Sequence, residues 1–229
     1  MATQMLYLHW KNVRLGLVPF VVAAFGLPLL VVQGAGRPEG ITDAFYASFL
    51  LESSQVWLSL FPILAAATGV TLALSAWSWD HAGNHVYALA LPVSRARYAL
   101  LKFGGGALLA LLPAAALLTG GLLAAASVAL PLGVQAYPLA VAMRFFYSTL
   151  LVYALTFALA AGTIRTAVMV ITAWVATLIA GDLVLQVAAM ALARPELATV
   201  NVTQWAYRLL TDWPGPFHIL AGNWSLIDV

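Results

Sequence analysis

The run FGGGALLALLPAAALLTGGLLAAASVA, from Phe103 to Ala129, decides the fold class of this chain. It contains no charged residue, and as a helix rising about 1.5 Å per residue it is long enough to cross a hydrocarbon core of about 30 Å. Alanine and leucine dominate it, and the alternating pattern of a membrane β-barrel strand is absent. The run therefore predicts a transmembrane helix. Its glycines, Gly104 to Gly106, Gly120 and Gly121, are expected where helices approach closely.

Four further runs of the same kind lie before and after it, so we expect five spans. Prolines inside the runs are expected to kink the helices, because proline removes a backbone donor. The predicted fold class is an all-α membrane protein, a polytopic helical bundle with five clear spans and an N-terminal interfacial helix; a sixth span is missing or absent. The other runs are about Leu15 to Val32, Val56 to Trp77, Phe145 to Ala161 and Ala167 to Ala193, and the prolines are Pro19, Pro28, Pro62 and Pro113.

The composition agrees with this class. Hydrophobic residues make up 63% of the chain and charged residues 8%, and the mean hydropathy is +0.96, far from the values of soluble domains. The net charge is only +2 and forms no basic patch, so a nucleic-acid partner is not expected. Cysteine is absent, which excludes thiol catalysis and disulfides. Phosphate-loop and serine-hydrolase motifs are absent as well, so we expect no enzyme activity and no cofactor.

Residues 1–14 carry an apolar face opposite a polar one. Lys11, Asn12 and Arg14 lie on the polar face. This pattern predicts an amphipathic helix that lies in the membrane interface and turns into the first span. The alternative is the frayed start of that span, which would place Lys11 and Arg14 deeper, where charge is costly. The apolar face comprises Met5, Leu6, His9, Trp10, Val13 and Leu17.

The basic residues predict the orientation. With a cytoplasmic N-terminus, most Lys and Arg residues fall on the cytoplasmic side, as is usual for short loops. We therefore expect a multi-pass protein of the inner (cytoplasmic) membrane. Residues 194–229 are expected to form an outer-surface tail with an interfacial aromatic belt, unless the chain from about Phe217 begins a sixth span. The cytoplasmic set is Lys11, Arg14, Arg95, Arg97, Lys102 and Arg165, the outer set is Arg37, Arg144, Arg194 and Arg208, and the belt is Trp205, Tyr207, Trp213, Phe217 and Trp224.

The polar interruption WSWDHAGNHVYALALPVSRARY, from Trp77 to Tyr98, separates two long apolar runs. Its middle part, from Asp80 to Leu91, can form a short amphipathic helix that Pro92 would end. The apolar side of such a helix would fit a groove on a soluble partner. The alternative is an interfacial loop helix with no partner. His81 and His85 have the spacing of half a helical zinc site, but no third ligand accompanies them, so no metal is expected.

This segment resembles the ABC-2 type permease family. The matching features are an acid after a span that ends in aromatic and small residues, a glycine three residues later, the apolar Ala88 to Leu91, then Pro92-Val-Ser94-Arg95, and Lys102 opening the next span. In that family the segment includes the coupling helix that docks on a cytoplasmic ATPase. The resemblance covers roughly the first two thirds of the chain. It departs from the family at Asp80, where glutamate is usual, and in having five spans instead of six. The ATPase-coupling residues that it implies, within a coupling segment at 79–98, are Asp80, Gly83, Tyr87, Leu89, Leu91, Pro92 and Arg95.

The resemblance implies a single transmembrane permease domain over residues 1–229. Such a chain would form half of the translocation pathway of an ABC transporter, with export the expected direction. Its implied partners are a cytoplasmic P-loop ATPase subunit, a second permease subunit that makes a homo- or heterodimer, and membrane lipids. The alternative is a structural or assembly subunit of a membrane complex that transports nothing, since polar residues inside the spans are few. A secondary transporter is not indicated, because the sequence shows neither an internal repeat nor a pair of broken helices.

Asp182 lies deep in the fifth span. A charge there costs at least about 2.5 kcal/mol unless it finds a partner or water. Counted at about 1.5 Å per residue, Arg144 reaches a similar depth. We therefore expect Arg144 and Asp182 to form an intramembrane polar pair between the fourth and fifth spans, with Gln186 one turn further along. Such a pair would lock two helices together or take part in substrate or proton movement.

Overall fold

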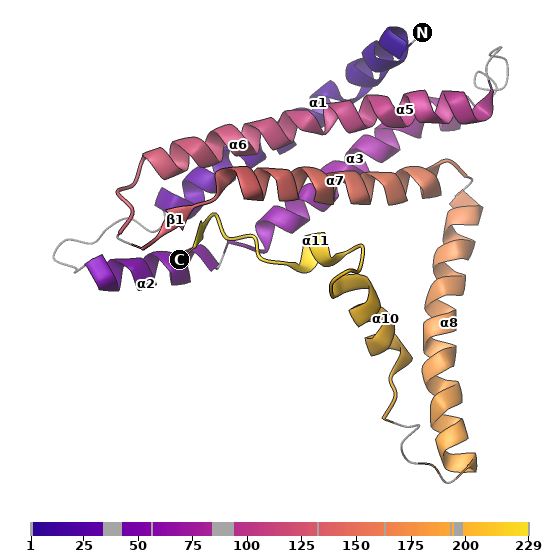
Figure 1. Ribbon diagram of the computed structural model, residues 1–229. Coiled ribbons are helices and arrows are strands. Elements are labelled where there is room, and N and C mark those ends of the chain that lie inside the picture. The colour runs from indigo at the N-terminus through magenta and orange to yellow at the C-terminus, as the bar shows by residue number, and fades with distance from the viewer. Residues whose placement is uncertain are drawn as a thin grey trace. The chain divides into compact units, whose positions relative to one another are not determined.

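Figure 1 shows the computed structural model, which describes residues 2–33, 43–55, 57–83, 94–131, 133–162, 164–192, 194 and 199–228. Five of its helical segments are long and apolar enough to cross a membrane. The prediction of an all-α membrane protein with five spans is confirmed. The segments are Leu6–Gln33, Leu60–Ala82, Arg95–Ala126, Pro138–Ala160 and Arg165–Ala191.

Helices dominate the described chain, and two short strands accompany them. In order along the chain, the elements are α1 (Ala2–Gln33), α2 (Asp43–Gln55), α3 (Leu60–Ala82), α5 (Arg95–Leu109), α6 (Leu111–Ala126), β1 (Gln135–Ala136), α7 (Pro138–Ala160), α8 (Ile164–Ala191), α10 (Val202–Thr211), α11 (His218–Ala221) and β2 (Ile227–Asp228).

The chain divides into two compact units. The first comprises Met1–Ala158 and Asn223–Val229, and the second comprises Leu159–Gly222. In the first unit α1 packs mainly along α6 and also contacts α3 and α5. In the second unit α10 packs against α8 and α11.

Glycines allow the helices of the first unit to approach closely. A Cβ atom at Gly120 in α6 would overlap the backbone carbonyl of Phe25 in α1, and one at Gly69 in α3 would lie 2.7 Å from the carbonyl oxygen of Thr149 in α7. Small residues are what membrane helix interfaces favour. The expected close contact is therefore found at Gly120, whereas the position of a Cβ at Gly104 meets open space.

A proline coincides with a helix break in the third span but not in α1. The third span is interrupted at Ala110, between α5 and α6. Pro113 explains the break, since its nitrogen cannot donate to the carbonyl of Leu109 four residues before it. Pro19 and Pro28 lie inside α1, which nonetheless runs as one helix.

Helix α1 runs without interruption from Ala2 through the predicted interfacial segment into the first span. His9, Val13 and Leu17 are buried on one face, as the helical spacing predicted. Lys11 and Arg14 are exposed on the other face. The long side chains of these two residues can therefore place their charges in the polar headgroup layer.

The C-terminal residues return to the core of the first unit. Strand β2 pairs antiparallel with β1, so that Ala136 lies opposite Ile227. The ring of Trp224 is stacked on that of Phe61, with the ring centres 6.2 Å apart. Trp224 is only 3% exposed, so its indole belongs to the core of the first unit, and its expected place in an interfacial belt stays a prediction. The indole is covered because the short β-pair holds this end of the chain against the bundle.

The helices that flank the polar interruption extend further into it than the hydropathy predicted. Helix α3 runs to Ala82 instead of ending near Trp77, so Asp80 belongs to the spanning helix and not to a separate short one. Helix α5 begins at Arg95, where the Ser94 side chain accepts a hydrogen bond from the Arg97 amide. A serine in this position stabilises a helix start.

Candidate functional site

The ends of α3 and α5 flank the central part of the predicted coupling segment. Tyr87, Leu89, Leu91 and Pro92 lie outside the described residues. Gly83 and Arg95 are described, and both are exposed at the helix ends. The candidate site that the structure does describe is the junction between these two helix ends.

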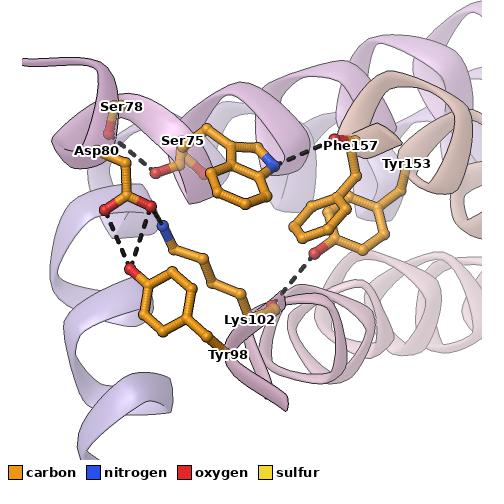
Figure 2. A network of polar contacts seen from close by, with 8 residues as sticks. Ser75, Ser78, Asp80, Tyr98, Lys102, Tyr153 and Phe157 are labelled. Atoms are coloured by element: carbon orange, nitrogen blue, oxygen red, sulfur yellow. Dashed lines mark hydrogen bonds and ion pairs between the residues drawn. The ribbon is translucent and has the colours of Figure 1, made fainter. Parts of the chain in front are cut away.

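A buried ion pair joins α3 to α5 at this junction. The Lys102 ammonium contacts Oδ2 of Asp80. The Tyr98 hydroxyl donates to the same carboxylate, at 3.0 Å from Oδ1 and 3.1 Å from Oδ2. Figure 2 shows these three side chains pointing toward one another. We call Asp80, Tyr98 and Lys102 the clamp.

Both charges of the clamp are largely removed from water. The side chain of Asp80 is 3% exposed and that of Lys102 is 11% exposed. Removal of one partner from a buried pair typically costs 3–5 kcal/mol, because it leaves an uncompensated charge. The clamp is therefore a specific link between the two helix ends, and neither charge can be removed without consequence.

Aromatic residues extend the clamp toward α7. The Lys102 ammonium lies 4.5 Å from the ring centre of Trp77, a favourable cation–π geometry. The Trp77 indole donates to the carbonyl oxygen of Phe157, at 3.1 Å. The Tyr153 hydroxyl donates to the carbonyl of Phe103, at 3.1 Å. Three helices, α3, α5 and α7, are thus cross-linked by polar contacts close to the flanks of residues 84–93 (Figure 2).

A cavity of about 640 Å³ lies beside the clamp, between α1, α3 and α5. His9, Ala76, Asp80 and Tyr98 are its buried lining residues. Nε2 of His9 lies 3.4 Å from the Ser75 hydroxyl. No site role was predicted from the sequence for His9, Tyr98 or Lys102. The available indications were that His9 shares the apolar face of residues 1–14 and that Lys102 opens the third span.

Asp182 has its partners in its own unit. Its carboxylate accepts hydrogen bonds from the backbone amide of Val202, at 2.5 Å, and from the hydroxyl of Thr203, at 2.6 Å. Asn201 completes this helix start by accepting from the Gln204 amide, at 2.7 Å. Because the first amides of a helix lack intrahelical partners, a carboxylate is stabilising there. Asp182 therefore anchors the N-terminus of α10 to α8.

Arg144 lies in the other unit. Its guanidinium donates to the backbone carbonyl of Asn223 and lies 5.6 Å from the ring centre of Trp224. These contacts hold the returning C-terminal residues against α7. The expected pair with Asp182 stays a prediction, and Gln186, which was expected to share it, is exposed on α8.

Within the described ranges, no three His, Asp or Glu side chains come together as a metal site would require. The chain was also compared with protein-family models, with curated proteins and with solved structures, and none of them matched. The sequence pattern and the geometry of the clamp therefore remain as the indications of function.

Proposed function

We propose that this chain is the membrane-spanning subunit of an ABC transporter, that it forms half of an export pathway, and that a separate cytoplasmic ATPase drives it. The observation that carries the proposal is the clamp. It joins the two helix ends between which the segment resembling the ABC-2 type coupling helix lies, and it does so with a buried ion pair.

A docking segment can transmit movement to the membrane helices only if the two helices that flank it are held rigidly together. If the flanking helices were joined only by apolar contacts, a push on residues 84–93 would be lost in sliding between α3 and α5. The hydrogen bonds of Tyr98 and the ion pair of Lys102 hold α5 to Asp80 at the end of α3. A partner that moves the segment would therefore move α3 and α5 together, and α7 with them through the indole of Trp77.

The charges at this end of the first unit support its placement in the cytoplasm. Five basic side chains gather there and only one acid, Asp80, accompanies them among the described residues of these helix ends. Positive loop and helix-end residues favour the cytoplasmic side. This arrangement supports an inner-membrane protein with a cytoplasmic N-terminus. The basic residues are Lys11, Arg14, Arg95, Arg97 and Lys102.

A second permease subunit, identical or related, would complete the pathway, since one bundle of five spans encloses only half a gate in this scheme. Coupling between the ATPase and the pathway would be reciprocal. Substrate would change ATP binding by the same factor by which ATP changes substrate binding.

The test is co-purification from the native host in mild detergent. We expect a P-loop ATPase to accompany the wild-type chain and to be lost from the Leu89→Asp and Arg95→Glu variants. Arg14→Glu makes the same charge change at an exposed position of α1 and is expected to retain the ATPase. Asp80 is unsuitable for this purpose, because its burial means that a substitution would disturb the helix ends themselves.

Association only with other integral subunits, with no ATPase and no effect of either variant, would contradict the proposal. It would favour the alternative of a structural subunit. Retention of the ATPase by Leu89→Asp and Arg95→Glu would contradict the assigned docking segment, and so would an equal loss from Arg14→Glu.

A further inference from the structure

The cavity beside the clamp has a floor of buried residues and a mouth of exposed residues. Its floor is formed by buried residues that include His9, Ala76 and Asp80. Its mouth is formed by exposed residues from α1 and from the end of α3. Those mouth residues are Leu8, Lys11, Asn12, Trp79, Ala82 and Gly83. A volume of about 640 Å³ is within the usual range of sites for small organic ligands.

The charges of the lining favour an anion at the mouth. Asp80 and Lys102 neutralise each other on the floor, and Lys11 is the other charged residue of the lining. Within the part of the chain that the structure describes, Lys11 has no acidic partner. Asn12 adds an amide donor next to it. The lining therefore carries one uncompensated positive charge where the cavity opens.

The other lining residues favour a ligand in which an apolar group is attached to the anion. Leu8 and Ala82 line the mouth together with Trp79, whose side chain is 70% exposed. Tryptophan is favoured at the level of lipid headgroups. The cavity also lies between three helical segments that qualify as membrane spans, so lipid is the solvent nearest to it. A small soluble anion would leave these apolar walls unused.

From this lining we infer a binding site for a phospholipid with a net negative headgroup, whose phosphate is held by Lys11 and Asn12 and whose glycerol and upper chains lie against Leu8 and Trp79. A choline headgroup is disfavoured. Its cation would approach Lys11, and the one carboxylate of the lining is already engaged by Lys102 and Tyr98. Basic pockets between spans on the cytoplasmic side bind acidic lipid headgroups in general.

The site is independent of the proposed ATPase partner, and its test needs only the purified chain. Native mass spectrometry in mild detergent would compare binding of phosphatidylglycerol and phosphatidylcholine with identical acyl chains. One basic residue near a headgroup contributes about 1 kcal/mol, so we expect phosphatidylglycerol to bind about fivefold more tightly.

Four variants locate the site. Lys11→Gln is expected to abolish the fivefold preference, and Lys11→Arg is expected to keep it. Ala82→Trp would fill the mouth and weaken phosphatidylglycerol binding, without altering the floor. Arg14→Gln removes an exposed charge from the next turn of α1, outside the lining, and is expected to change the preference less than twofold.

Equal binding of the two lipids to the wild-type chain would overturn the inference. So would a preference that survives Lys11→Gln, or phosphatidylglycerol binding that Ala82→Trp leaves as tight as in the wild type, since the lipid would then lie elsewhere on the helices. An effect of Arg14→Gln as large as that of Lys11→Gln would assign the preference to the surface charge in general and would equally refute a site at the cavity. Free glycerol phosphate, if it displaced the lipid at equal concentration, would show that the apolar walls contribute nothing.

Discussion

Loss of the Lys102 charge is expected to destabilise the first unit strongly. In Lys102→Met the side chain keeps most of its length, while Asp80, 3% exposed, retains only the Tyr98 hydroxyl as a described polar partner. Removal of one partner of a buried pair costs about 3–5 kcal/mol. Asp80→Asn is expected to cost less, because the amide oxygen still accepts from Tyr98 and the Lys102 ammonium keeps the Trp77 ring at 4.5 Å.

The double variant Asp80→Asn with Lys102→Met isolates the interaction between the two charges. With both charges removed, no unpaired ion is left, so we expect the double variant to be more stable than Lys102→Met alone. The two single costs should therefore exceed the cost of the double variant by about 2 kcal/mol, within the range found for contacting residues. Arg97→Met removes an exposed cation from the same helix and is expected to change stability by no more than about 0.5 kcal/mol.

The assay is unfolding of the purified chain in mixed micelles by increasing SDS, followed by far-ultraviolet circular dichroism. The free energy of unfolding is obtained for the wild type, the two single variants, the double variant and Arg97→Met. A cost of less than about 1 kcal/mol for Lys102→Met, or single costs that simply add in the double variant, would show that the clamp does not join α3 to α5.

Three further predictions concern packing and the C-terminal residues. Gly120→Ala is expected to lower the free energy of unfolding by about 1–3 kcal/mol, the usual cost of overpacking, because its methyl group would overlap the Phe25 carbonyl. Gly104→Ala is the control and should be neutral or stabilising, because its methyl group would meet open space. Thermal melting of the two variants in detergent measures the difference. Asp182→Ala should speed amide hydrogen exchange in α10, because two of its first amides lose a carboxylate acceptor; unchanged exchange would contradict the anchor. Trp224→Ala should cost about 3–5 kcal/mol, as is usual for a buried aromatic residue, and an unchanged SDS unfolding midpoint would contradict its burial.

The spanning helices could be predicted because their evidence is local. An apolar run of sufficient length has no stable alternative in lipid, whatever the rest of the chain does. The ends of the runs depend on distant residues instead. Hydropathy ends the second span near Trp77 because Asp80 is charged, but the pairing of Asp80 with Lys102, 22 residues further along the chain, allows the helix to continue to Ala82.

The candidate site was predictable only in part for the same reason. Asp80 was predicted from the sequence to be a surface residue of a docking helix, whereas it is buried in the structure. Asp182 was expected to need a partner, and the structure supplies the first amides of α10. Backbone amides carry no signature in the sequence, so a search for a basic side chain could not find them. His9 could be placed on a buried face, but its neighbour Ser75 lies on another helix.

The clamp and the cavity share residues, which gives lipid binding a consequence for the proposed transport cycle. Asp80, Tyr98 and Lys102 form the clamp and also line the cavity. If ATPase docking tilts α3 and α5 as one body relative to α1, the distance between the clamp and Lys11 on α1 changes. A lipid held between Lys11 and Trp79 would then bind one arrangement better than the other. Since such coupling is reciprocal, ATP should alter the affinity for phosphatidylglycerol in the wild-type complex and leave it unaltered in Lys11→Gln, where the lipid no longer distinguishes the two arrangements.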